Sequence, residues 1–221
     1  MTFRIPTMPV LSTSRQRPPS WFAGVAGQAV LESEGPTLLQ AFAERPGPPW
    51  LWVAPESQGL ATPNAGVTLR TRGQGFSGVL RCGTALPLAS EAVGTVILQH
   101  VIEDGLAWPE LLEECARVLL PGGRLWVFAL NPLSPYRRHW FGSGVQVIEP
   151  ITWRRRLRTH GLQPEPVSQG IGPRWRVAPA PDLQIGAGVR AAYLLRAEKR
   201  VIPLTPFRQR AVRWTPGVSA T

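Results

Sequence analysis

The segment Glu114–Pro135, ECARVLLPGGRLWVFALNPLSP, decides the fold. Its pattern indicates the end of a helix, a glycine-containing turn, an apolar strand and a polar loop with two prolines. This order is one half of an α/β unit, and the loop after the strand lies where such folds bind ligands. The segment therefore predicts an α/β protein and directs attention to the ends of its other strands.

Apolar periodicity predicts further elements on both sides of this segment. Trp21–Glu44 has helical spacing interrupted at Gly35-Pro36, which predicts two short helices or one kinked helix. The other expected elements are strands at Trp50–Ala54, Gly66–Thr71, Gly78–Cys82, Thr95–Val101 and Arg124–Leu130, helices at Trp108–Leu119 and Thr152–Gly161, and a late strand at Val189–Lys199. Strands that alternate with helices predict a mainly parallel sheet covered on both faces.

The length of 221 residues predicts one domain, which we place at residues 21–200. Prolines in residues 1–20 predict a flexible N-terminal segment, and residues 201–221 form a basic, proline-containing tail. Cys82 and Cys115 are too far apart in sequence to suggest a disulfide framework, so they favour a reducing, cytoplasmic location. No apolar run is long enough to span a membrane, and the start lacks the apolar centre of a signal peptide.

The net charge of +10 is concentrated in the last part of the chain. Up to Tyr136 there are 9 arginines against 10 acids, whereas from Arg137 onward 14 arginines and one lysine face 4 acids. Clustered cations predict contact with nucleic acid or another polyanion, although a solvated helix face or an arginine-rich genome explains the same counts. The candidate contact residues are Arg137, Arg138, Arg154, Arg155 and Arg158.

The stretch Ala85–Pro135 resembles the second half of the class I S-adenosylmethionine-dependent methyltransferase fold, of the methyltransferase type 11 kind. The resemblance rests on the Leu86-Pro87 pair, a strand that ends at His100, a helix containing ECARVL, the PGG turn and the next strand. The NPLS loop and the later RAEKRVIPLTPFR are similar to a small bacterial group of such proteins. The resemblance implies a Rossmann-like, mostly parallel seven-stranded sheet flanked by helices.

The resemblance also implies S-adenosylmethionine as cofactor, bound across the carboxyl ends of the first four strands. Open α/β sheets bind ligands at that edge because the loops diverge where the strand order reverses. Carried over by position, the cofactor-binding residues are Glu56, Gly59, Cys82, Gly83, Thr84 and His100.

Four departures from the family pattern lie on the cofactor side. The loop after the first strand, PESQGL, has only Gly59 where the family is rich in glycine. Arg70-Thr71-Arg72 replaces the acid that closes the second strand, Cys82-Gly83-Thr84 replaces an Asp, and Val93-Gly94 replaces Phe-Asp. The sequence thus leaves two hypotheses: a methyltransferase of unknown acceptor with a degraded cofactor site, or an inactive module of this fold that binds a protein or nucleic acid.

His100 and Asn131 are the catalytic candidates, because they follow the strands that end at the ligand edge. Histidine suits proton transfer near neutral pH, but methyl transfer depends mainly on alignment, so a strand-end histidine bonded to backbone is an equal alternative. A plain turn is the alternative for Asn131. Three histidines and two cysteines are too scattered for a metal site, and none is predicted.

Overall fold

The computed structural model describes residues 20–63, 66–72, 75–78, 81–103 and 108–200. The predicted end segments, 1–20 and 201–221, therefore lie outside the described residues except for Ser20. In chain order the elements are η1 (Trp21–Ala23), α1 (Val25–Ala43), β1 (Trp50–Ala54), β2 (Gly66–Arg72), β3 (Gly75–Gly78), β4 (Val93–Gln99), α2 (Trp108–Val118), β5 (Leu119–Leu130), η2 (Pro135–His139), α3 (Pro150–Thr159), β6 (Leu162–Pro164), β7 (Gln169–Ile171), β8 (Gln184–Ile185) and β9 (Ala192–Lys199).

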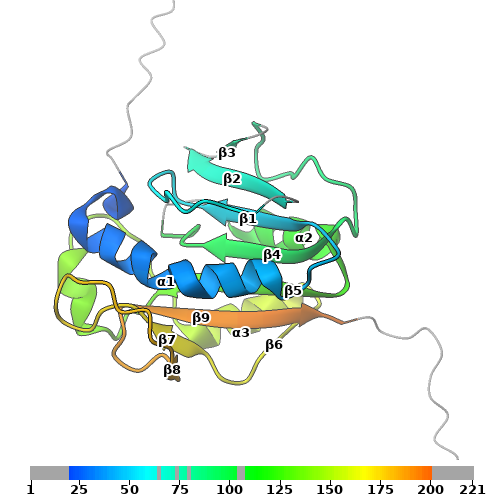
Figure 1. The fold of residues 1–221 in the computed structure, drawn as a ribbon. Helices are drawn as coiled ribbons and strands as arrows, with labels where there is room; N and C mark the ends of the chain where they lie inside the picture. Colours follow the sequence, from blue (N-terminus) through cyan, green and yellow to red (C-terminus); the bar gives the residue numbers. More distant parts are fainter. Residues whose placement is uncertain (1–19, 64–65, 73–74, 79–80, 104–107, 201–221) are drawn as a thin grey trace, which may run out of the picture.

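One mixed sheet forms the centre of the fold, in the order β3-β2-β1-β4-β5-β9-β7-β8, with β6 also paired to β9 (Figure 1). The middle strands β2, β1, β4 and β5 are parallel, and the outer strands pair antiparallel. The predicted α/β class is confirmed. The described residues give nine strands rather than seven, because β6, β7 and β8 are separate pieces of two or three residues.

Helices cover both faces of this sheet, α1 on one face and α2 and α3 on the other (Figure 1). The apolar side of α1 packs on tryptophans of β1 and β5. The α2 residues Leu111, Leu112 and Cys115 pack on the opposite face, where α3 adds Trp153. The middle strands are therefore covered on both faces, which explains why every residue of β1 and β4 is buried.

The connection from β1 to β2 forms no helix in its described part, Pro55–Pro63, although parallel neighbours are usually joined through one. Large side chains of β1 instead pack against β2. The Trp50 ring fills the space in which a side chain at Gly66 would lie. The Arg70 guanidinium lies 4.7 Å from the centre of the Trp52 ring, a cation–π contact.

The strand expected at Gly78–Cys82 is wrong in position, with residues 79–80 of it outside the described residues. The observed β3 ends at Gly78 and runs antiparallel to β2, with Gly75 opposite Arg72, and Cys82 forms only an isolated bridge with Phe76. Strands that follow each other after so short a connection can pair only antiparallel, because a parallel pair needs a long crossover. Gly75 is required there, because a Cβ would lie 2.5 Å from the Cys82 carbonyl oxygen.

One smaller expectation also changed. The Pro121-Gly122-Gly123 turn lies inside β5, where β5 advances from Leu119 to Arg124 while β4 advances only from Val93 to Thr95. The extra residues form an irregularity in the sheet, with Gly122 at φ +70°, rather than a separate turn before the strand. Of the two alternatives for the N-terminal helical region, the structure has the single helix: residues 25–43 form one helix with Pro36 inside it.

Candidate functional site

A buried polar cluster lies at the carboxyl end of β4, where β1 and β4 mark the reversal of strand order. His100 follows β4 with φ +51°, an uncommon conformation that histidine tolerates better than most residues. Its backbone N–H donates to the Phe128 carbonyl at 3.0 Å, which anchors the turn to β5. The His100 side chain is 0% exposed, so the turn directs the imidazole into the protein rather than to solvent.

Glu34 of α1 supplies the partner for this imidazole. Its two carboxylate oxygens accept from His100 Nε2 at 2.9 Å and from Gln99 Nε2 at 2.7 Å. Glu34 is also 0% exposed, and the Phe22 ring stacks on the imidazole with 4.5 Å between ring centres. Together η1 and α1 thus cover the end of β4: the Phe22 ring stacks on the His100 imidazole, and Glu34 is bonded to it.

Glu103 approaches the other side of the imidazole, 3.7 Å from Nδ1, and accepts from the Leu130 backbone N–H at 2.7 Å. Burial lowers the pKa of His100, but the charges of Glu34 and Glu103 and the hydrogen bond to Glu34 outweigh burial and raise it to about 10. The imidazole is therefore a cation at neutral pH. In this state it cannot accept a proton, and its present role is to join α1, β4 and β5.

The loop after β1 joins the same cluster through Gln58. Gln58 Nε2 donates to Gln99 Oε1 at 3.4 Å, and Gln58 Oε1 accepts from the Leu60 backbone N–H at 3.2 Å. Sequence reasoning missed Glu34, Gln58 and Gln99. The available signals were a carboxylate among the buried positions of α1 and a glutamine that closes an otherwise apolar strand.

The other predicted cofactor residues lie in two loops. Glu56 and Gly59 are exposed, as is Gly83, while Cys82 and Thr84 are half-buried. An added Cβ at Gly59 or Gly83 would meet nothing within 4 Å, so the backbone there is open to a ligand. Within the described part of the chain no hydrogen bond joins the Glu56–Gly59 loop to Cys82–Thr84, and His100 alone of the predicted set enters the buried cluster.

Asn131 is buried and braces a neighbouring loop. Its Nδ2 donates to the carbonyls of Gly188 at 2.9 Å and Arg190 at 3.0 Å, and its Oδ1 accepts from the Leu133 N–H at 3.1 Å. With these bonds the amide fixes residues 188–190 against the end of β5. A catalytic role for Asn131 stays a prediction.

The predicted cationic contact residues belong to two different elements. Arg137 and Arg138 lie on η2, whereas Arg154, Arg155 and Arg158 lie on α3. Arg154 is half-buried and its Nε donates to the Glu165 carbonyl at 3.2 Å, so it is partly engaged in holding the fold. The other four are exposed.

Comparison with known proteins agrees with this architecture. The central residues 64–127 match the methyltransferase domain family. A Thermotoga maritima protein described as a SAM-dependent methyltransferase, possibly a histamine N-methyltransferase, superimposes with a TM-score of 0.55 at 14% identity, over 81% of this chain and 93% of that one. An Archaeoglobus fulgidus SAM-dependent methyltransferase gives 0.52 at 12% identity, over 76% and 93% of the respective chains. This chain has the class I methyltransferase fold. No curated protein sequence matches the chain.

The described residues contain no group of three or more His, Cys, Asp or Glu side chains arranged to hold a metal ion. None of the helices in the described ranges has the length and apolar character needed to cross a membrane.

Proposed function

We propose that the protein is an S-adenosylmethionine-dependent methyltransferase with a reduced donor site and an acceptor still to be identified. The observation that carries this proposal is the open loop Glu56–Leu60, which follows β1 at the reversal of strand order and is tied to the end of β4 through Gln58. That edge is where the methyltransferase fold places its ligand.

The residues present fit the amino acid end of S-adenosylmethionine but not its ribose. Glu56 offers an exposed carboxylate to an ammonium group, and the backbone at Gly59 is uncovered. At the end of β2, where an acid would accept from ribose hydroxyls, Arg70 stands instead and is engaged with the Trp52 ring. Each missing hydrogen bond of about 1 kcal/mol weakens binding several-fold without preventing it.

The donor supplies an activated methyl group, and the protein supplies alignment, which methyl transfer chiefly needs. The buried Glu34–His100 pair joins α1 to the end of β4, and Glu103 joins the residues after β4 to the end of β5. Because the pKa of His100 is raised to about 10 in spite of burial, this residue does not deprotonate an acceptor at neutral pH. The proposal therefore favours acceptors whose attacking atom needs no general base.

A second candidate function is a non-catalytic module that uses the fold for binding a protein or nucleic acid. It is favoured by the packing at the donor edge, where Phe22 stacks on His100 and both side chains are completely buried. A donor that touched His100 would have to displace Phe22.

Titration calorimetry with S-adenosylmethionine and S-adenosylhomocysteine separates the two candidates. A Kd in the low micromolar range supports the methyltransferase, and absence of heat at millimolar ligand supports the module. Glu56→Gln should weaken binding several-fold, while Glu110→Gln, an exposed carboxylate on α2, is the matched control. Equal affinities for the two variants would refute the proposed role of Glu56.

A further inference from the structure

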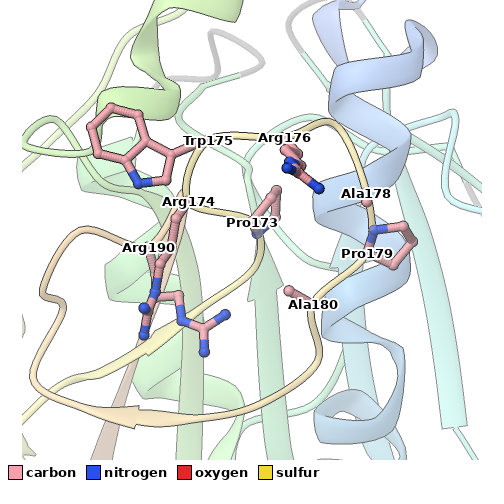
Figure 2. A pocket seen from close by; sticks show the side chains of 8 residues that line it. All are labelled: Pro173, Arg174, Trp175, Arg176, Ala178, Pro179, Ala180 and Arg190. Carbon is pink, nitrogen blue, oxygen red and sulfur yellow. The ribbon is translucent and has the colours of Figure 1, made fainter.

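A hollow of about 430 Å³ lies in the segment between β7 and β9, at the edge of the sheet where β5 ends. Figure 2 shows Trp175, Arg174 and Arg190 on one side of it and Ala178, Pro179 and Ala180 on the side nearest α1. The residues that line it are Pro173, Arg174, Trp175, Arg176, Ala178, Pro179, Ala180 and Arg190. Three of the eight are arginines, and none is acidic.

Arg190 is the unusual member of this lining. It is only 8% exposed, its Nη1 donates to the Gly172 carbonyl at 3.1 Å, and its Nε has no hydrogen-bond partner. Among the described residues no carboxylate lies within 4.0 Å of Arg190, Arg174 or Arg176. A guanidinium stays charged in proteins, and a buried charge without a counter-charge is unfavourable. An anion in the hollow would remove that cost.

Several bonds hold the loop around the hollow in one shape. The Ala180 N–H donates to Ser33 Oγ of α1 at 2.9 Å, and the Gly172 N–H donates to the Ala180 carbonyl at 3.2 Å. Arg138 Nη2 donates to the Trp175 carbonyl at 2.7 Å from η2. The hollow is therefore built by α1, η2 and the loop together, and does not depend on a free surface segment.

Trp175 adds a second kind of contact. The residue is 56% exposed although it is a large apolar ring, and it lines the hollow beside Arg174. An exposed indole next to cations favours a flat ring that carries negative charge, because stacking and charge-assisted hydrogen bonds then act on one molecule.

We propose that this hollow is a binding site for a small organic anion, a carboxylate or phosphate attached to a flat ring. Arg190 and Arg174 bind the charged group, and Trp175 stacks on the ring. The proposal does not rest on methyl transfer, because the lining shares no residue with the Glu56–Leu60 loop or with the Glu34–His100 pair.

The test uses phenyl phosphate, benzoate and inorganic phosphate as probes in calorimetry with the full chain at low and moderate salt. The ring-bearing anions should bind at least several-fold more tightly than inorganic phosphate, and the tighter of the two identifies the charged group. Arg190→Gln should weaken binding about tenfold or more, Arg174→Gln about tenfold, and Trp175→Ala should remove the advantage of the ring. Arg174 and Trp175 are exposed, so their variants remain informative if Arg190→Gln fails to fold.

Arg155→Gln, which removes an exposed charge on α3, is the matched control and should leave the affinity unchanged. Equal weakening in Arg155→Gln and Arg174→Gln would show general attraction to a basic protein and overturn the site. Displacement of phenyl phosphate by S-adenosylhomocysteine would also overturn it, because the hollow would then be part of the donor site. Phenyl phosphate binding in a protein that does not bind S-adenosylhomocysteine would support this inference and refute the proposed function alone.

Discussion

The parallel pairs β4–β5 and β1–β2 differ in how the chain connects their two strands. From β4 to β5 the chain passes through α2, whose buried stripe packs on the strands. From β1 to β2 the described residues form no helix, and β2 continues into an antiparallel hairpin with β3. The first arrangement places a helix between its two strands, whereas the second has none in its described residues and β1 is covered by α1 and by its own large side chains.

This difference matters for the proposed function, because the β1–β2 connection contains the loop that we propose binds the methyl donor. In a βαβ unit the helix that follows the first strand presents backbone N–H groups to a ligand. Here β1 leads to Pro55–Pro63 without a helix, so any ligand at that edge must be held by side chains and loop backbone. The half with α2 has a helix between its strands, and the half with the Glu56–Leu60 loop has none in its described residues.

Replacement of Trp52 tests whether the helix-free half depends on its own side chains. Trp52 is completely buried in β1, touches Phe42 of α1 and carries the Arg70 guanidinium over its ring. We expect Trp52→Ala to lower the free energy of unfolding by about 4 kcal/mol, measured by urea denaturation. Trp175→Ala, at an exposed position, should change it by less than about 0.5 kcal/mol. A loss below about 1 kcal/mol for Trp52→Ala would show that β1 is supported in some other way.

Replacement of Glu34 tests the junction between the halves. In Glu34→Gln the amide NH₂ would face the N–H donor of Gln99 or of His100. The His100 imidazolium would also lose the carboxylate at its Nε2. We expect a loss of about 3 kcal/mol in the free energy of unfolding. In the double variant Glu34→Gln/His100→Gln, part of this loss should be recovered, because both charges are gone. Strict additivity of the two single effects would argue against a coupled pair.

The pH dependence of stability examines the same pair without changing the chain. The folded pKa of His100 is raised from 6.5 to about 10, with the two carboxylates outweighing burial, so between these values the folded state binds one proton more than the unfolded state. The contribution is complete below about pH 6.5 and is lost as the pH rises toward 10. Between pH 7 and 9 we expect a decline of about 1 kcal/mol per pH unit. His100→Gln should show a flatter profile; equal slopes would contradict the raised pKa.

The sequence predicted the β4–α2–β5 half well because its signals are local. The stripe formed by Leu111, Leu112 and Cys115 and the apolar run of β4 each follow from periodicity alone. The direction of β3 was missed, because a short Gly-rich strand has no strong pattern and its direction depends on pairing with β2. The Glu34–His100 pair was missed for a related reason: 66 residues separate its members, and the helix that carries Glu34 reads as polar in part.

Removal of Arg117 gives the smallest expected effect and probes the well-covered half. From α2 this side chain pairs with Glu114 at 2.7 Å and donates to the carbonyls of Leu86 and Leu88 at 3.0 and 2.8 Å, which fixes the loop before β4. The guanidinium is one-third exposed, so solvent screens the ion pair and the loop bonds carry most of the effect. We expect Arg117→Gln to lower the free energy of unfolding by about 1 kcal/mol in urea denaturation, against no measurable change for Arg155→Gln.

Because α2 and β4 pack without this loop, amide exchange should accelerate in residues 86–92 and stay slow in β4. Faster exchange throughout β4 would mean that this half, too, depends on single side chains rather than on its helix.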